Sequence, residues 1–210
     1  MKLKWFLSLT LFRFLHACLP ALHGLTNAQN KKYYNFAVNN CNEITSEGLI
    51  ENCIKESYVL NYDFKTINDQ LISTDKIKKP IVLLAAASWS APCWGEVPAL
   101  NKMVEKYDDK VAFVMIISDK KAKAQRMAAK LDKRIKLVPA RDLDKIDKNY
   151  LDISGFVHKL DYPSAYLIDK NKKIINVKRG ALTPTKKLKW DEVTTTNIAN
   201  FETFLAPVLN

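Results

Sequence analysis

The chain has 210 residues, of which 48% are hydrophobic, and it carries 5 glycines, 8 prolines and a formal net charge of +11. This length allows one domain plus a targeting segment, and the composition excludes a disordered chain. The lysines are mixed with aspartates and lack the aromatic-interleaved basic motif of nucleic-acid-binding proteins. We therefore interpret the charge as a lysine-rich solvated surface, compatible with weak attraction to anionic surfaces, and expect no nucleic-acid partner.

Residues 1–28 have the pattern of a secretory signal peptide. They contain no acid, start with two lysines and an apolar stretch, and end in Thr26-Asn27-Ala28, the small residues that a signal peptidase reads. Arg13 and His16 interrupt the apolar stretch, which argues against a stable membrane-spanning helix. We expect cleavage after Ala28 and a periplasmic or secreted protein.

Two alternatives would leave the protein anchored to a membrane. Leu15-His16-Ala17-Cys18 has some features of a lipoprotein box, so a lipid on Cys18 is one alternative. An uncleaved segment 1–28 is the other. If neither holds, Cys18 is an inert residue of a discarded peptide.

Residues 29–62 are polar and weakly periodic, and we predict an N-terminal extension with a short hairpin ahead of a domain at 63–208. Cys41 and Cys53 lie close together in this extension. In an oxidising compartment they are expected to form a structural disulfide, which would stabilise the fold by about 2–3 kcal/mol on the chain-entropy model. The alternative is that one of them forms a redox pair with Cys93.

The central feature of the sequence is a strand followed by a helix. Residues 81–87 are an unbroken apolar run, typical of a strand that is buried on both faces. Apolar residues then recur at spacings of three and four, which predicts a helix over 92–107. Cys93 therefore lies near a helix N-terminus, where free N–H groups and the helix dipole favour a thiolate.

The remaining elements alternate between strands and helices, which predicts an α/β fold with a sheet covered by helices. The expected strands are 57–62, 111–117, 135–138, a segment within 161–169, and 174–178. The expected helices are 63–72, 119–131, 143–151, with an apolar face of Leu143, Ile146 and Tyr150, and a C-terminal helix around 198–205.

The strand, the turn Trp89-Ser90-Ala91-Pro92-Cys93 and the helix with Glu96 and Pro98 resemble the thioredoxin superfamily, most closely its TlpA-like branch. Those proteins carry Trp-Cys-x-x-Cys at this turn, and here Ser90 replaces the first cysteine. The resemblance extends to about residue 205. It implies a thioredoxin-like fold with a central mixed sheet flanked by helices, and thiol-disulfide chemistry with protein thiols or disulfides as partners.

The resemblance also implies a binding groove. In the family, a cis-proline faces the active-site turn, which places Tyr162 and Pro163 against Cys93, with the Tyr162–Pro163 peptide in cis. Trp89 and Pro92 would line this groove, and Trp94 would lie at its rim or in the core. Glu96 either tunes a proton near Cys93 or is simply an acid in the first turn of a helix.

The replacement of the outer cysteine limits the chemistry. A dithiol cycle needs one sulfur to attack a disulfide and a second to release the mixed disulfide, and serine cannot attack without a neighbouring base. Three interpretations stay open: thiol redox work by Cys93 alone, including a peroxidase reaction; a redox-inactive module that binds a peptide or partner protein; or a redox pair with Cys41 or Cys53. The fragment Ser90-x-x-Cys93 is also found in peroxiredoxins, although their preceding proline is absent.

The sequence offers no further catalytic arrangement. His158 is interpreted as a surface histidine rather than a base. The sequence lacks cysteines and histidines with zinc-binding spacing, a glycine-rich phosphate loop and a Ser-His-Asp arrangement. We expect neither a metal nor a cofactor.

The signal-peptide hypothesis can be tested by N-terminal sequencing of the protein from its native host. We expect the mature chain to begin at Gln29, because Ala28 ends the small-residue stretch. A lipid-modified chain that begins at Cys18 would establish the lipoprotein alternative instead. A cytoplasmic protein that retains Met1 would rule out export.

Overall fold

The computed structural model describes residues 31–147 and 150–209 of the chain. Within it, residues Tyr33–Asn210 form one compact unit. The signal peptide expected at 1–28 and the lipid site at Cys18 lie outside the described residues. Among the helices that are described, none has the length and apolar character needed to cross a membrane.

A five-stranded mixed sheet with the order β10-β9-β3-β4-β5 forms the centre of the fold. Strand β3 is parallel to β4, and β4 is parallel to β5, whereas β9 is antiparallel to both β3 and β10. Every residue of β3 is buried, as expected for a central strand. The strands are β3 (Ile81–Ala86), β4 (Ala112–Lys120), β5 (Lys136–Ala140), β9 (Ser164–Ile168) and β10 (Ile174–Arg179).

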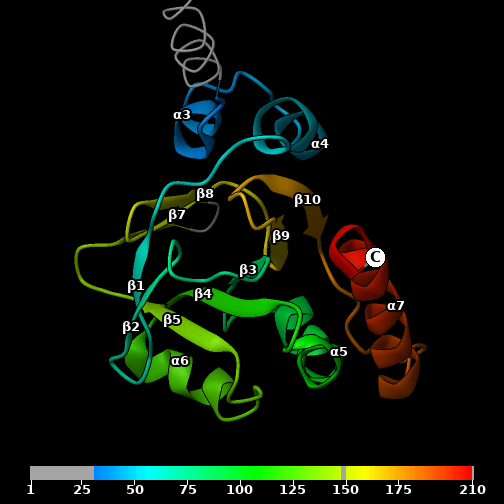
Figure 1. Cartoon of the computed structure of the whole chain (residues 1–210). Coiled ribbons are helices and arrows are strands. Elements are labelled where there is room, and N and C mark those ends of the chain that lie inside the picture. Colours follow the sequence, from blue (N-terminus) through cyan, green and yellow to red (C-terminus); the bar gives the residue numbers. More distant parts are fainter. Residues whose placement is uncertain (1–30, 148–149, 210) are drawn as a thin grey trace, which may run out of the picture. The chain divides into compact units, whose positions relative to one another are not determined.

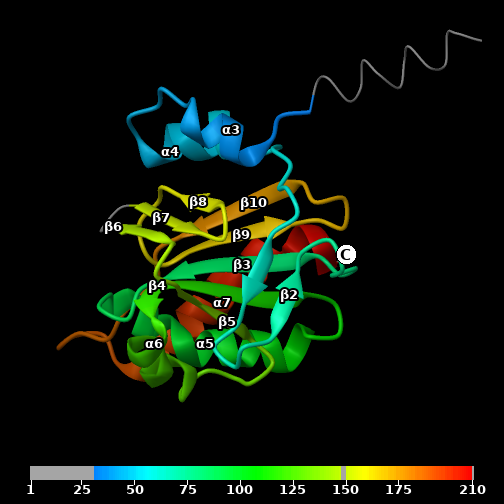
Figure 2. The same ribbon diagram turned by 90° about the vertical axis from the view of Figure 1, so that its left-hand side faces the viewer.

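Three helices gather along one side of this sheet, as Figure 2 shows: α5 (Ala91–Tyr107), α6 (Lys121–Ala128) and α7 (Trp190–Leu209). Helices α5 and α7 pack against each other, and α6 packs on β4 and β5. The connections β3-α5-β4 and β4-α6-β5 advance in the same direction, so right-handed crossovers place both helices on the same face. The mixed sheet with flanking helices confirms the predicted fold class.

The N-terminal extension packs on the same unit (Figure 1) and is helical. It contains α3 (Tyr34–Asn39), α4 (Ser46–Gly48) and the π-helix η1 (Leu49–Ile54). Tyr34 is fully buried, its ring stacks on Phe156 with 4.9 Å between ring centroids, and its hydroxyl donates to the Val157 carbonyl at 2.7 Å. The hairpin predicted within 29–62 is therefore wrong for the described part. Burial of the Tyr34 ring organises this segment, a contact that local periodicity does not reveal.

Two predicted elements nearby are also wrong. The segment 63–72, predicted as a helix, is a hairpin of β1 (Asp63–Lys65) and β2 (Leu71–Ser73). Asp69 in its turn has a φ of 62°, a left-handed conformation that aspartate adopts more readily than most residues. The strand expected at 57–62 is reduced to isolated bridges at Tyr58.

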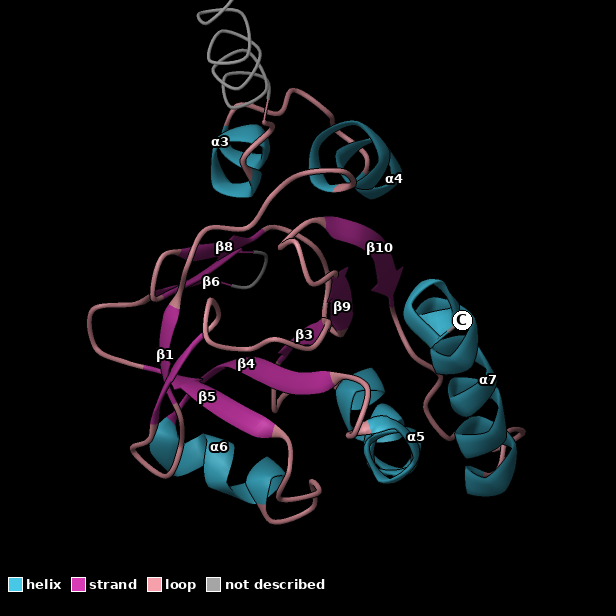
Figure 3. Ribbon diagram, in the orientation of Figure 1, coloured by secondary structure: helices cyan, strands magenta, loops and turns pink. Residues whose placement is uncertain are grey.

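A small three-stranded sheet replaces the helix predicted over 143–151. It consists of β6 (Lys145–Asp147), β7 (Tyr150–Ile153) and β8 (Phe156–His158) (Figure 3). Leu143, which was to lie on the apolar face of that helix, is 95% exposed. The side chain of Asp144 instead accepts hydrogen bonds from the Arg141 and Ser154 backbone N–H groups, at 2.8 and 3.1 Å, and so fixes a turn. Ser154 and Gly155 both have positive φ, which suits a two-residue hairpin between β7 and β8.

The close approach of α5 to the loop before α7 yields a stability prediction. A Cβ atom added at Gly95 would lie 2.3 Å from the Leu182 carbonyl oxygen and 2.9 Å from the Thr183 Cα, both backbone atoms. We expect Gly95→Ala to destabilise the protein by about 1–3 kcal/mol through overpacking, despite the better helix propensity of alanine. Chemical denaturation would measure the change.

The matched control is Thr195→Ala on an exposed position of α7. It also improves helix propensity but introduces no contact, so we expect it to be neutral or slightly stabilising. A Gly95→Ala variant as stable as this control would show that α5 and the loop can separate without loss.

Candidate functional site

Cys93 lies in the first turn of α5, directly after the turn that leaves β3. Pro92 precedes it within that turn and adopts a backbone conformation suited to a helix start. Ser90 is the N-cap residue, and its carbonyl accepts from the Cys93 backbone N–H at 3.1 Å. Cys93 is only 4% exposed and is the free cysteine among the described residues.

Ser90 connects this turn to a distant part of the chain. Its hydroxyl does not cap the helix but donates to the Tyr162 carbonyl at 3.2 Å, across 72 residues of sequence. The next peptide bond, Tyr162–Pro163, is cis, as the family resemblance implied. The antiparallel pairing of β9 with β3 brings the start of β9 next to the turn that follows β3. The four site residues that meet here are Ser90, Cys93, Tyr162 and Pro163.

Aromatic side chains border the site. Trp89 is 58% exposed and meets the ring of Tyr162 edge-on at 5.7 Å. Trp94 is half-buried, and its Nε1 donates to the Ser88 carbonyl at 2.7 Å, which stabilises the turn. A shallow hollow of about 400 Å³ lies beside Trp89, with Ser118 also on its wall. Trp89 therefore has the exposure that a groove-lining residue needs, whereas Trp94 holds the turn.

Glu96 lies one turn further along α5 and is buried in an ion pair. Its carboxylate meets the Lys178 ammonium group, which also donates to the Gly180 carbonyl at 2.7 Å and lies 4.7 Å from the centre of the Phe201 ring. Burial raises the pKa of Glu96, and the charge of Lys178 opposes that shift. The first turn of α5 contains no acidic residue, so the alternative of a first-turn acid at Glu96 is wrong.

Burial also determines the acidity of Cys93. Desolvation raises the pKa of its thiol to about 11, while hydrogen bonds involving Ser90 and the Ala87 backbone lower it and the charges of Glu96 and Asp119 raise it. Burial therefore opposes the thiolate that the helix N-terminus favours, and the raised pKa argues against the expected acidic thiol.

Several residues near the site were missed or misread in the sequence. His158, interpreted as a surface histidine, is fully buried, and its Nδ1 lies 2.7 Å from the Tyr166 hydroxyl. Burial lowers the pKa of His158 to about 3, so the imidazole stays neutral. Asp119 at the end of β4 accepts from the Ser88 backbone N–H at 2.7 Å and fixes the turn that leads from β3 to Cys93. In the sequence, Asp119 lies just beyond the apolar run 111–117, and this position was the signal that could have identified it as a residue of the site.

Cys41 and Cys53 are joined by a disulfide in the extension, with their Cα atoms 6.1 Å apart. In this arrangement neither offers a sulfur to Cys93. The extension is tied to the site by Arg179, which pairs with Glu47 of α4 and with Asp161, each at 2.6 Å. Asp161 directly precedes the cis peptide. Among residues 31–147 and 150–209, no group of three or more histidines, cysteines or acids is placed to hold a metal ion.

Comparison with known proteins identifies the family. The model of the family described as AhpC/TSA matches residues 57–177, more than half of the chain. The chain belongs to this family. This match, together with the fold, confirms the thioredoxin superfamily that the turn at residues 89–93 had indicated.

Individual relatives are distant. The thioredoxin-like protein YneN of Bacillus subtilis is 25% identical over 124 residues, which span 59% of this chain and 70% of that protein. A thiol:disulfide interchange protein of the thioredoxin family from Chlorobium tepidum is 16% identical, with a TM-score of 0.53 over 74% of this chain and 98% of its own. The thio-disulfide isomerase of Thermus thermophilus is 16% identical, with a TM-score of 0.48 over 70% of this chain and 96% of its own.

The acidity of Cys93 can be measured by alkylation with iodoacetamide across a pH series. Only the thiolate reacts, so we expect the rate in the folded protein to keep rising through pH 10, in line with a pKa of about 11. In urea, where the thiol is solvated, the rate should level off above about pH 9, because a free thiol has a pKa near 8.5. Ser90→Ala should move the folded profile to still higher pH. A plateau below pH 9 in the folded protein would show that the helix N-terminus outweighs burial.

Proposed function

We propose that this protein is an exported thioredoxin-fold protein that exchanges thiols with protein disulfides through Cys93 alone. The observation that carries the proposal is the hydrogen bond from Ser90 to the Tyr162 carbonyl, which keeps the turn and the cis-proline together around a single free sulfur. Trp89, Pro92, Tyr162 and Pro163 would bind the substrate chain, and Cys93 would be the catalytic residue.

The proposed reaction needs an external thiol. The Cys93 thiolate attacks one sulfur of a substrate disulfide; a bond forms between these two sulfurs, and the second substrate sulfur leaves as a thiolate that takes a proton from water. A low-molecular-weight thiol then displaces Cys93 from the mixed disulfide. The single Ser90 hydroxyl proton, donated to the Tyr162 carbonyl in the resting site, would turn to the sulfur once the thiolate forms, and Glu96 would tune the protonation of that sulfur. The raised pKa of Cys93 makes the first step slow near neutral pH.

A second candidate is a binding module without redox turnover. The burial of Cys93 favours it, because a sulfur with 4% exposure is poorly placed to attack. The groove beside Trp89 and Pro163 would then hold an extended peptide or partner protein. A peroxidase reaction of Cys93 is a further variant of the one-thiol hypothesis, tested by peroxide consumption with and without Cys93→Ser.

Export is part of the proposal. The charged and apolar pattern of residues 1–28 supports it, and the Cys41–Cys53 disulfide suits an oxidising compartment. We propose that a signal peptide at 1–28 precedes the extension at 29–62 and the thioredoxin-like domain at 63–208. Membrane association through residues 1–28, or through a lipid on Cys18, belongs to the same proposal.

Insulin reduction separates these functions. We expect negligible turnover by the wild-type chain, because one sulfur cannot complete the dithiol cycle. The Ser90→Cys variant should restore turnover, since the N-cap position and Cys93 flank one turn and the rest of the site is in place. A new thiol at the helix N-terminus would attack, and Cys93 would resolve.

The control combines Ser90→Cys with Cys93→Ser, which keeps the new thiol but removes the resolving one. It should return turnover to the wild-type level. A Ser90→Cys variant that forms the new disulfide but stays inactive would favour the binding module. Insulin reduction by the wild-type chain that persists in Cys93→Ser would contradict the one-thiol proposal, and partner binding unchanged by Cys93→Ser would support the module.

A further inference from the structure

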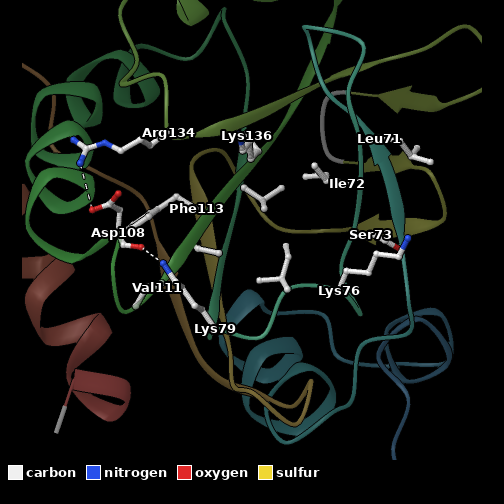
Figure 4. A pocket seen from close by; sticks show the side chains of 13 residues that line it. Leu71, Ile72, Ser73, Lys76, Lys79, Asp108, Val111, Phe113, Arg134 and Lys136 are labelled. Atoms are coloured by element: carbon white, nitrogen blue, oxygen red, sulfur yellow. Dashed lines mark hydrogen bonds and ion pairs between the residues drawn. The ribbon is translucent and has the colours of Figure 1, made fainter.

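A second hollow lies at the opposite edge of the sheet from Cys93. It has a volume of about 490 Å³ and is formed by β2, the loop before β3, and the starts of β4 and β5 (Figure 4). Cys93 follows the carboxyl end of β3, whereas Ala112 in this hollow begins β4. From Ala112 to Ile117, β4 advances five residues at ~3.3 Å each, so the two sites lie on the order of 17 Å apart.

The inner surface of this hollow is apolar. Most apolar side chains in this fold are buried, but three in this hollow are only half-buried: Ile72, Ile77 and Ala112. Phe113 and Val114 of β4 complete the surface, and Figure 4 shows Ile72 and Phe113 on opposite sides of the hollow. Its volume falls within the range of roughly 300–1,000 Å³ that is usual for sites of small organic ligands.

The rim of the hollow is cationic. Four basic side chains, Lys76, Lys79, Arg134 and Lys136, surround it, against one acid, Asp108. Arg134 pairs with Asp108 at 3.3 Å and with Asp132 at 2.8 Å, and Lys79 donates to the Asp108 carbonyl. The single acid is thus already engaged.

Two of these cations are available to a ligand. Within residues 31–147 and 150–209, the ammonium groups of Lys76 and Lys136 make no ion pair or side-chain hydrogen bond. Both side chains are exposed at the rim, one on each side of the apolar surface. An apolar hollow bordered by unpaired cations is complementary to a molecule with an apolar body and an anionic end.

We propose that this hollow binds a single-chain amphiphile with an anionic head group, of the fatty-acid type. The alkyl chain occupies the apolar surface beside Ile72 and Phe113, and the carboxylate lies at the cationic rim to which Lys76 and Lys136 contribute. Each methylene removed from water strengthens binding by up to about fourfold, so the chain provides affinity and the lysines select the charge. The site makes no use of Cys93 and is independent of the thiol chemistry proposed above.

Isothermal titration calorimetry of the chain without residues 1–28 would test this, with dodecanoate below its micelle concentration as the probe. We expect saturable binding of one molecule per chain, and weaker binding of octanoate. Dodecyltrimethylammonium, which has the same chain and the opposite charge, and inorganic phosphate, which has charge but no chain, should not bind. Cys93→Ser should bind dodecanoate as the wild type does, which separates this test from that of the thiol function.

The charge variant is Lys76→Glu with Lys136→Glu, and the matched control is Lys123→Glu with Lys187→Glu at exposed positions away from the hollow. We expect the Lys76→Glu, Lys136→Glu variant to bind dodecanoate at least about tenfold more weakly, because two exposed positive charges at the rim become negative. The control, with the same net charge, should bind normally. Absence of saturable binding, equal binding of the cationic amphiphile, or equal weakening in both variants would overturn the proposal. Binding of dodecanoate only when it is embedded in phosphatidylcholine vesicles would assign the surface to membranes and would also overturn it.

Discussion

The antiparallel pairing of β3 with β9 is the constraint on which the candidate site depends. It places the start of β9, with the cis peptide between Tyr162 and Pro163, beside the end of β3, where the turn to Cys93 begins. The hydrogen bond from Ser90 to the Tyr162 carbonyl closes this arrangement. If the register shifted by one residue, every side chain of β9 would change face and the contact would be lost.

The burial that makes this arrangement stable also limits its chemistry. The turn, the cis-proline loop and Glu96 surround Cys93 so closely that its thiol is held in the neutral form at physiological pH. In a two-cysteine relative, an inner sulfur of this kind reacts only after the outer sulfur has attacked a disulfide. Here Ser90 supplies a hydroxyl three residues before Cys93, so in the function proposed above the sulfur acts without a second thiol in this turn.

The two edges of the sheet present different surfaces. The carboxyl edge of β3 carries a shallow hollow beside Trp89, and the amino edge of β4 and β5 carries an apolar hollow with a cationic rim. The N-terminal extension is joined to the domain by two contacts. Tyr34 of the extension stacks on Phe156 in the core, and Arg179 pairs with both Glu47 of the extension and Asp161 next to the cis peptide.

The sequence by itself determined the elements whose signals are local. The apolar run of β3, the helical spacing of α5 and the turn from Trp89 to Cys93 were enough to predict the fold class and the candidate site. Local patterns gave wrong predictions where distant contacts decide. The segment 143–151 has helical spacing, but Leu143 stays exposed and the Asp144 turn forms instead. The helical extension depends on burial of Tyr34, and the pKa of Cys93 depends on desolvation by segments far away in the chain. Burial is a property of the packed structure, so only the tertiary fold could decide that Cys93 is a weak acid and that His158 is a neutral core residue.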